Sequence, residues 1–553
     1  MKTTEYFAES RLFHALLVLH CTKSPSLAAQ ARRTAAADMR TKYRVAAVLL
    51  LLLAALFITS CGEIPPDTSL SPMETEAEHS ASGKYDDPVA EVRGIYIATV
   101  YNLDFPSRPG LDADTLASEL DDIIENSVSL GFNAIYFQVR GASDAMYDSD
   151  IFPVSEYLTG KRGGTLPDGF DPLAYLIEKA HARGVAVHAW VNPLRITRGG
   201  TMKEPMTDTD ELPQGSPART SPELTFAYAG ELYYDAGIPE VRRLVADGVS
   251  EIAAGYDVDG ILFDDYFYPY PEDGCEIDDA LTYEKYGNGG NIGDWRRDNI
   301  NEMVKMCRDA VKATDPDCLF GIAPFGIWRN NDGANGGSDT RGFESYDEIF
   351  CDTLEWVRKG YVDYVAPQIY WSFSKESAPF GVLTDWWCAQ LDGTDTGLLI
   401  SHAAYKYGTD EWKFAGTVSE LREQLTYSRR LISYRGSIIY GYSELCRDTD
   451  GAASDVKESF EDDVYYVTPI PTGSGVDITY PAYGSSLTDD TVTLHGTSAP
   501  EYPVYCNGAK IARRRGGEFY LTVKLSEGEN LFEFINGGEK CVFMLIYHEK
   551  SVA

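Results

Sequence analysis

The sequence is short of the residues that common metal and redox sites require. It has eight histidines without a His-x-x-x-His pair, and ten cysteines without a Cys-x-x-Cys pair. These absences exclude a zinc ribbon and a thioredoxin motif, and we expect neither a metal nor another cofactor. Basic residues are also scarce: the chain has 48 Lys and Arg against 85 Asp and Glu, which gives a formal net charge of −37. The electrostatic field of so negative a protein repels nucleic acid, so we do not expect nucleic acid as a partner.

Most of the cysteines are scattered through the central part of the chain, where buried free thiols are expected. Cys506 and Cys541, near the C-terminus, are the one pair that we consider for a disulfide.

The N-terminus has the pattern of a bacterial lipoprotein signal peptide. Basic residues after Met39 precede the apolar run VAAVLLLLLAALFI and a short cleavage site that ends at Cys61. The stretch ITSC resembles a lipobox, whose cysteine becomes the lipid-bearing N-terminus. We therefore expect an extracytoplasmic protein that is anchored to the cell membrane by a lipid at Cys61. The alternative is a plain transmembrane anchor, for which a run of ~15 residues is short.

Composition divides the chain into five segments. Residues 1–61 contain the signal peptide. Met39 is the better candidate for the start codon, so residues 1–38 can be interpreted as upstream sequence that is not part of the protein. Residues 62–88 are acidic and rich in Pro and Ser, which predicts a disordered tether. A main domain follows at 89–465, then a linker at 466–474 and a β-rich accessory module at 475–550.

The main domain alternates between short β-branched or aromatic runs and longer stretches of helical period. Eight runs are predicted as strands, at 92–100, 133–140, 185–193, 260–267, 319–326, 364–371, 397–404 and 436–443. Helices are predicted between and after them, at 112–131, 171–184, 239–255, 294–314, 349–360, 381–391, 417–430 and 450–463. This alternation predicts an α/β fold of the (β/α)8 TIM-barrel type, with a parallel sheet buried on both faces.

Two connections of the barrel, at 141–170 and 194–238, are too long for simple turns, and long loops of this kind usually shape a substrate cleft. Beyond the linker, short alternating runs separated by Asn-Gly and Gly-Gly turns predict a small immunoglobulin-like β-sandwich. Such a module serves either as a spacer or as a glycan-binding unit, and the spacer is favoured because no aromatic platform is evident.

Polar and aromatic residues follow the predicted strands at the end where a barrel carries its reacting groups. The residues expected to bind substrate there are Gln138, Arg140, His188, Trp190, Asn192, Arg195, Tyr266, Arg329, Gln368, Tyr370 and Trp371. Each of them has an ordinary structural explanation when taken singly, as a rim hydrogen bond, a core histidine or a packed ring. Together they suit a sugar, which has apolar C–H faces and a fringe of hydroxyl groups.

The stretch DGILFDDYFYPYP places two adjacent carboxylates, Asp264 and Asp265, at the end of a buried strand. Neighbouring side chains on a strand point to opposite faces, so we expect one carboxylate to face the barrel opening and the other to lie behind it. A glycosidase pair then needs another acid. Glu444 is the candidate by position, with Asp144 and Glu156 as rivals.

Several blocks together carry a resemblance to a known family: EVRGIYIATVYNLDFP, NAIYFQVRGASDAMY, FDPLAYLIEKAHARGVAVHAWVNPLR, DVDGILFDDYFYP, FGIAPFGIWRN and DYVAPQIYW. The chain resembles the glycosyl-hydrolase-like 10 family of bacterial lipoproteins over about residues 90 to 445. The resemblance implies a TIM-barrel glycoside hydrolase at the cell envelope, with peptidoglycan glycan strands as the substrate class. It also implies a catalytic carboxylate at Asp264 and Asp265 and a sugar site that includes Gln138, Asn192, Arg329, Gln368 and Tyr370.

Two other functions remain open at this point. A barrel that has lost a catalytic acid can persist as a non-catalytic glycan-binding envelope protein. The FDD stretch also occurs in metal-dependent polysaccharide deacetylases, but that chemistry needs closely spaced histidine ligands. Only His188 and His402 lie at the ends of predicted strands.

Overall fold

The computed structural model describes residues 89–548 with gaps at 199–205, 288, 413–418, 430, 432, 461–465, 468–475, 482, 484, 489, 499–503, 512–518 and 537–538. The signal peptide, Cys61 and the tether therefore lie outside the described residues.

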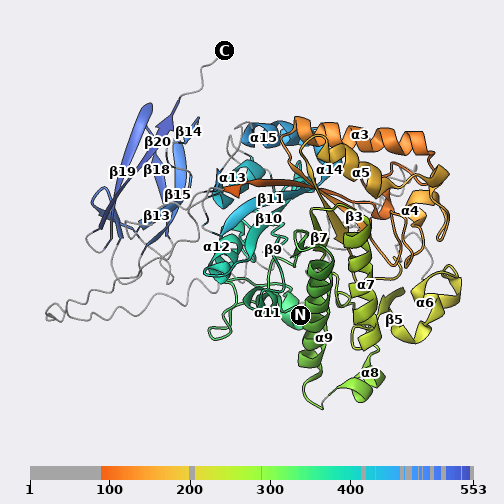
Figure 1. Cartoon of the computed structure of the whole chain (residues 1–553). Coiled ribbons are helices and arrows are strands. Elements are labelled where there is room, and N and C mark those ends of the chain that lie inside the picture. Colours follow the sequence, from red (N-terminus) through yellow and green to blue (C-terminus); the bar gives the residue numbers. More distant parts are fainter. Residues whose placement is uncertain are drawn as a thin grey trace, which may run out of the picture. The chain divides into compact units, whose positions relative to one another are not determined.

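The main domain contains a closed barrel of eight parallel strands (Figure 1). Its strands are β2 (Val92–Ile97), β3 (Ala134–Arg140), β4 (Ala186–Val191), β7 (Gly260–Phe263), β8 (Leu319–Ile322), β9 (Tyr364–Val365), β10 (Gly397–Ala403) and β11 (Tyr434–Tyr440). Each strand pairs with its neighbour along the chain, and β11 pairs with β2 to close the ring. The predicted barrel is thus confirmed, with all eight strands at the expected places.

Helices lie outside the barrel strands in Figure 1. The larger ones are α3 (Ala113–Ser129), α5 (Pro172–His181), α7 (Pro239–Gly255), α9 (Ile292–Thr314), α12 (Phe380–Leu391), α13 (Glu420–Ser428) and α15 (Ala452–Ser459). Capping residues in the sequence mark where two of these helices begin. The side chain of Asp112 accepts a hydrogen bond from the Thr115 amide at the start of α3, and Asp171 does the same for Ala174 in α5.

The strands bury apolar side chains on both faces. One face packs against the helices in a large continuous core, and the other fills the barrel interior with a separate cluster that includes Tyr136, Trp190, Leu262 and Tyr364. Because side chains alternate along a strand, Asp264 continues the inward series of Leu262 at the carboxyl end of β7. The barrel therefore carries a carboxylate at the end of its packed interior.

The two long connections have secondary structure of their own. Residues 141–170 include α4 (Glu156–Thr159), and residues 194–238 include α6 (Pro217–Thr220) and the hairpin of β5 (Thr225–Tyr228) and β6 (Glu231–Tyr234). A loop after β8 contains α10 (Ser345–Glu348) and leads into α11 (Thr353–Lys359). Among the residues that the structure describes, no helix has the length and apolar character needed to cross a membrane.

The C-terminal module is all-β, as predicted. One sheet consists of β13 (Val476–Tyr480), β15 (Thr491–Ser498) and β18 (Phe519–Lys524). The other consists of β14 (Ser486–Leu487), β20 (Glu539–Tyr547), β19 (Gly528–Asn536), β16 (Val504–Cys506) and β17 (Ala509–Lys510). They have a core of their own, around Leu494, Phe534 and Leu545. An immunoglobulin-like topology stays a prediction. The disulfide considered for Cys506 and Cys541 is not formed, because both thiols are free.

Candidate active site

Four hydrogen bonds converge on the carboxylate of Asp264, directly after β7. Its Oδ2 accepts from Trp190 Nε1 at 3.1 Å and from Asn192 Nδ2 at 3.0 Å. Its Oδ1 accepts from Gln368 Nε2 at 3.0 Å and from the backbone amide of Asp265 at 2.9 Å. Donors from β4, from the loop that follows it and from the segment after β9 therefore fix both oxygens, and together they stabilise negative charge on this group.

The donors are themselves held in place by other residues. Asn192 Oδ1 accepts from Gln138 Nε2 at 2.9 Å, and Gln138 Oε1 accepts from the backbone amides of Thr99 and Val100, both at 3.0 Å. Because each amide group makes bonds at both ends, its orientation is determined. The chain of hydrogen bonds thus links the ends of β2, β3 and β4 to Asp264.

The neighbouring Asp265 lies behind this arrangement. The Tyr270 hydroxyl donates to its Oδ2, whereas its buried Oδ1 has no hydrogen-bond partner among the described residues. Burial and the charge of Asp264 raise the pKa of Asp265 well above its usual range, and the bond from Tyr270 opposes this shift. The two carboxyl groups were expected to point to opposite faces, but they remain close enough to affect each other's charge.

Aromatic rings surround the carboxyl end of the barrel near Asp264. Tyr96 of β2 lies 5.2 Å from Trp190 and 6.0 Å from Tyr440, between ring centroids. Tyr440, the last residue of β11, is stacked on Tyr370 at 6.1 Å and meets Tyr405 edge-on at 5.8 Å. Tyr370, Tyr405 and Tyr440 are each only partly buried. Partly exposed rings of this kind offer faces on which the C–H side of a sugar can pack.

A second aromatic group lies on the loops after β7, β8 and β9. Tyr270 stacks on Phe343 with centroids 4.8 Å apart, and Phe325 contacts Trp371 at 5.5 Å. Tyr266 contacts Tyr270 at 5.4 Å. The predicted residues Tyr266, Tyr370 and Trp371 are therefore all parts of the aromatic surround.

Arg195 lies next to this surround on the loop after β4. Its Nε and Nη2 both donate to the carbonyl of Gly141, at 3.0 and 2.7 Å, and its guanidinium lies 4.7 Å from the Tyr266 ring centroid. Only 2% of the residue is exposed. The charge of Asp264 acts on this guanidinium, so Arg195 belongs to the electrostatic environment of the carboxylate.

Two other predicted residues have contacts away from Asp264. Arg140 is buried with its guanidinium 4.3 Å from the Phe152 ring, and its Nη1 lacks a partner in the part of the chain that the structure describes. His188 lies in the barrel interior, stacked on Tyr136 at 4.5 Å and bonded through Nδ1 to the Tyr364 hydroxyl at 2.9 Å. Burial lowers the pKa of His188 to about 4. Both residues have packing roles here.

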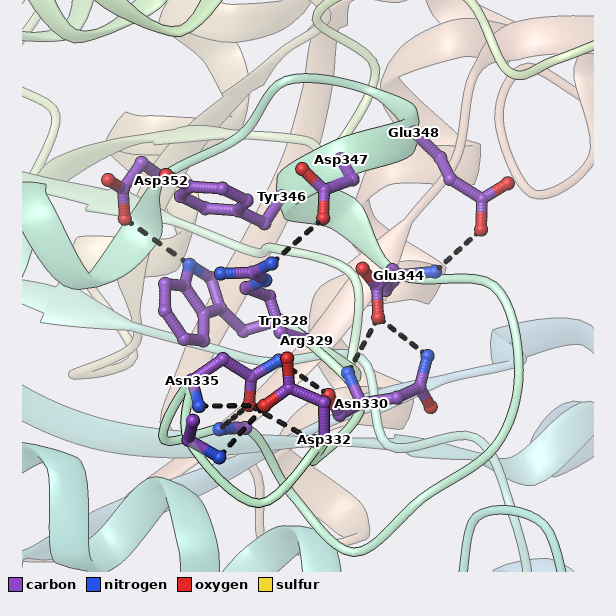
Figure 2. A network of polar contacts seen from close by, with 12 residues as sticks. Trp328, Arg329, Asn330, Asp332, Asn335, Glu344, Tyr346, Asp347, Glu348 and Asp352 are labelled. Carbon is purple, nitrogen blue, oxygen red and sulfur yellow. Dashed lines mark hydrogen bonds and ion pairs between the residues drawn. The ribbon is translucent and has the colours of Figure 1, made fainter. Parts of the chain in front are cut away.

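Arg329 is engaged in the network of the loop after β8 (Figure 2). Its Nη2 lies 3.2 Å from Asp347 Oδ2, and its guanidinium lies 4.6 Å from the Tyr346 ring. Figure 2 also shows Glu344 bound to Asn330, whose amide and side chain both donate to its Oε2, at 2.6 and 2.7 Å. The network shapes this loop, and Arg329 is one of its members.

The candidates for the second acid do not contact Asp264. Glu444, on α14 (Tyr442–Cys446), pairs with Arg447 at 2.6 Å, and its side chain is 24% exposed. Glu156, at the start of α4, binds Arg162 at 2.9 Å. Asp144 is buried, which raises its pKa, and it accepts a hydrogen bond from the Ala142 amide at 3.3 Å.

Comparison with known proteins identifies the family. The model of the family described as "Glycosyl hydrolase-like 10" matches residues 91–415. The chain belongs to the glycosyl hydrolase-like 10 family. It is 39% identical over 378 residues to glycosyl hydrolase YngK of Bacillus subtilis (strain 168), covering 68% of this chain and 72% of that one. It is 35% identical over 407 residues to glycosyl hydrolase DigH of Escherichia coli (strain K12), covering 71% and 91%.

Solved structures are more distant from this glycosyl hydrolase-like 10 member. The endo-β-1,4-mannanase from Thermotoga petrophila has 12% identity and a TM-score of 0.42, with 84% of this chain and 99% of that chain covered. The PgaB (BpsB) glycoside hydrolase domain from Bordetella bronchiseptica has 16% identity and the same TM-score, with 68% and 99% covered. Family membership, rather than these structures, supports a glycoside hydrolase-type function.

One acidic residue of this family member lies at the same end of the barrel and was not among the sequence candidates. Asp104 follows β2, in the block YNLDFP, and its carboxyl group is bound to the backbone of Ala98 and to Ser443. Burial raises the pKa of Asp104 to about 6. A signal for Asp104 is present in the sequence, because this acid follows the first predicted strand.

Within the described ranges, no group of three or more His, Cys, Asp or Glu side chains is placed to hold a metal ion.

Proposed function

We propose that this protein hydrolyses glycosidic bonds in an envelope or extracellular polysaccharide, with peptidoglycan glycan strands as its substrate. The observation that carries the proposal is the convergence of four donors on Asp264 at the carboxyl end of the barrel. Membership in the glycosyl hydrolase-like 10 family and the partly exposed aromatic rings around this group support it.

In this proposal Asp264 is the carboxylate that reacts at the sugar. Hydrolysis of a glycosidic bond needs one carboxylate that attacks the anomeric carbon or activates water, and one acid that protonates the leaving oxygen. The four donors hold Asp264 in a single orientation, which is the condition for either role. Asp264 lies at the end of the barrel interior, next to Tyr96, Trp190 and Tyr440. In this proposal the face of a sugar ring packs against the aromatic rings there.

Asp265 has a different role in the proposal. Burial and the charge of Asp264 raise the pKa of Asp265, and this favours its neutral form and a single negative charge beside the substrate. Asp265 thus lies behind Asp264, where its backbone amide donates to Oδ1, and it does not compete for the reacting position.

The test compares Asp264→Asn and Asp265→Asn with the wild type in the release of reducing ends from purified cell-wall glycan. We expect Asp264→Asn to lose turnover by ~10³-fold or more, and Asp265→Asn to lose less, because an amide replaces a neutral acid closely. Undiminished turnover in both variants would overturn the assignment.

A non-catalytic glycan-binding protein is the second candidate. The observation that favours it is the burial of both carboxylates, of which Asp264 is 6% and Asp265 is 3% exposed. The same wild-type preparation distinguishes the two functions: binding of glycan strands without release of reducing ends, in a folded protein, supports the binding function alone.

We further propose that the protein is a lipoprotein outside the cytoplasm, attached to the membrane through Cys61. The support is the order of basic residues, apolar run and ITSC stretch. Cys61→Ser should move the protein from the membrane fraction to the soluble fraction or leave it unprocessed. A Cys21→Ser control should have no effect on either measurement.

A further inference from the structure

The Asp264 and Asp265 pair lacks one part of a hydrolytic mechanism. A glycosidase needs an acid on the leaving-group side, with the two carboxyl groups about 5 to 9.5 Å apart. Asp264 and Asp265 are adjacent in the chain and share one hydrogen-bonded arrangement, so their carboxyl groups cannot lie on opposite sides of a glycosidic bond. The predicted partner, Glu444, is paired with Arg447 instead. This inference rests on the proposed hydrolase function and concerns the acid that the reaction still requires.

Asp104 is fixed at the carboxyl end of β2 by the path of its own loop. Tyr101 and Asn102 both have positive φ angles, of 58° and 52°, which turn the chain sharply after the strand. Non-glycine residues adopt this backbone conformation only where the surroundings stabilise it. Asn102 supplies part of that support, because its Nδ2 donates to the carbonyls of Pro106 and Tyr157 at 2.9 and 2.8 Å.

The turn folds Asp104 back onto the end of its strand. Its backbone amide donates to Ala98 O at 2.9 Å, and its Oδ2 accepts from the Ala98 amide at 2.9 Å. From the other side, Ser443 on α14 donates to Oδ1 at 2.9 Å. The carboxyl group is thus clamped between the ends of β2 and β11, and the residue stays partly exposed. A reacting acid needs both features, a fixed orientation and access to substrate.

Tyr440 connects Asp104 to the Asp264 site. It lies at the end of β11, where its ring contacts Trp190 at 6.4 Å between centroids, and Trp190 donates to Asp264. Burial raises the pKa of Tyr440, and the charges of both Asp104 and Asp264 raise it further. The two carboxyl groups therefore act on one hydroxyl from segments that follow different strands, β2 and β7.

We propose that Asp104 is the general acid of the reaction, which gives its proton to the leaving glycosidic oxygen at the site of Asp264. The bond between the anomeric carbon and this oxygen breaks, and its electron pair stays with the oxygen that takes the proton. One water molecule supplies the hydroxyl group that the anomeric carbon gains and the proton that restores Asp104.

The protonation state of Asp104 suits this task. Burial raises its pKa to about 6, the charge of Glu444 also raises it, and the hydrogen bonds from Ala98 and Ser443 lower it. A general acid works best when its pKa is near the working pH. Burial raises the pKa of three neighbouring groups on β11 and α14, Tyr440, Tyr442 and Cys446, and the charge of Asp104 raises each of them further.

The experiment measures kcat/KM for release of reducing ends from purified cell-wall glycan against pH, for the wild type, Asp104→Asn, Ser443→Ala and Glu444→Gln. Asp104→Asn should lose about 10²- to 10⁴-fold in turnover while keeping its glycan affinity. The two neighbouring variants should move the alkaline limb of the profile in opposite directions, and Ser443→Ala should also lose part of its turnover because its hydroxyl helps to orient the acid. Ser443→Ala removes a bond that lowers the pKa of Asp104, so its limb moves to higher pH, and Glu444→Gln moves it to lower pH.

Each other outcome overturns a specific part of the proposal. A wild type that releases no reducing ends contradicts the hydrolase function itself. An active wild type with an equally active Asp104→Asn variant contradicts only the role of Asp104. If Asp104→Asn does not fold, the neighbouring variants decide, and alkaline limbs that do not move in them rule out Asp104 as the titrating acid. Loss of turnover in Glu444→Gln, without a shift, would assign the acid to Glu444.

Discussion

Asn192 Nδ2 donates a 3.0 Å hydrogen bond to Asp264 Oδ2, while its Oδ1 accepts one of 2.9 Å from Gln138. The amide therefore cannot turn over without breaking both bonds. This relationship connects the central carboxylate to the backbone at the end of β2 and gives the first prediction.

Asn192→Leu, which keeps the side-chain volume and removes the donor, should lower kcat for glycan hydrolysis by about 10- to 100-fold, since a hydrogen bond to a charged group contributes ~1.5–3 kcal/mol. The measurement is kcat and KM on cell-wall glycan. Ser250→Ala, on the outer helix α7, is the control that should keep wild-type kinetics. An unchanged kcat in Asn192→Leu would show that the orientation of Asp264 does not limit the reaction.

Asp265→Asn should stabilise the protein more at pH 7 than at pH 4. The folded state holds Asp265 protonated because its pKa is raised, whereas the unfolded chain releases the proton above pH ~4. Folding then takes up a proton, so Asp265 lowers the free energy of unfolding as the pH rises from its unfolded pKa towards its folded pKa. Urea unfolding at both pH values measures the difference. A stability gain that is equal at pH 4 and pH 7 would contradict a raised pKa.

Glu91→Gln should lower the free energy of unfolding by about 3–5 kcal/mol, because it removes the buried carboxylate charge that balances two arginines. Glu91 is 2% exposed and binds Arg93 at 3.0 Å, Arg429 at 2.7 Å and the Tyr434 hydroxyl at 2.9 Å. Glu91 thereby links β2, which holds Arg93, to the end of α13 and to β11. Urea unfolding is the measurement.

A matched control for this ion cluster lies on the surface of α9. Lys305 pairs with Asp309 at 2.6 Å, and both side chains are more than 40% exposed. Lys305→Gln should change the free energy of unfolding by less than about 1 kcal/mol, since water screens an exposed pair. Similar losses in the two variants would show that the burial of Glu91 adds nothing.

Gly321→Ala should destabilise the barrel by about 1–3 kcal/mol or more through overpacking. A Cβ atom at this position of β8 would lie 2.2 Å from Cζ of Tyr364, whose hydroxyl binds His188. Gly255→Ala, at the end of α7, is the control, because a Cβ there meets nothing within 4 Å. Its thermal midpoint should stay equal or rise. A lower midpoint for Gly255→Ala than for Gly321→Ala would contradict this view of the barrel interior.

The order of strands and helices in the main domain could be predicted from local patterns. Strand and helix periodicities are properties of ten or twenty consecutive residues, and capping residues such as Asp112 and Asp171 mark helix starts within the same windows. The eight strands followed because each is buried on both faces and reads as an apolar run. The strand-end position of Asp264 followed from the same reasoning.

The contacts within the candidate site were less predictable. Arg140, His188 and Arg329 end predicted strands or follow them, yet the structure packs them against Phe152, Tyr136 and Tyr346. A bulge between Gln138 and Arg140 changes the register at the end of β3, and such a change redirects side chains without a clear sequence signal. Alternation alone therefore assigns faces reliably only within regular strands.

By itself the sequence determined the eight-stranded barrel, the β-rich C-terminal module and the family, because these depend on local periodicity and on ordered blocks of residues. Only the tertiary structure decided which polar groups meet. Gln368 reaches Asp264 across 104 residues of sequence, and Ser443 reaches Asp104 across 339. Barrel closure brings such distant strand ends together, and the paths of the loops then fix which of their side chains touch.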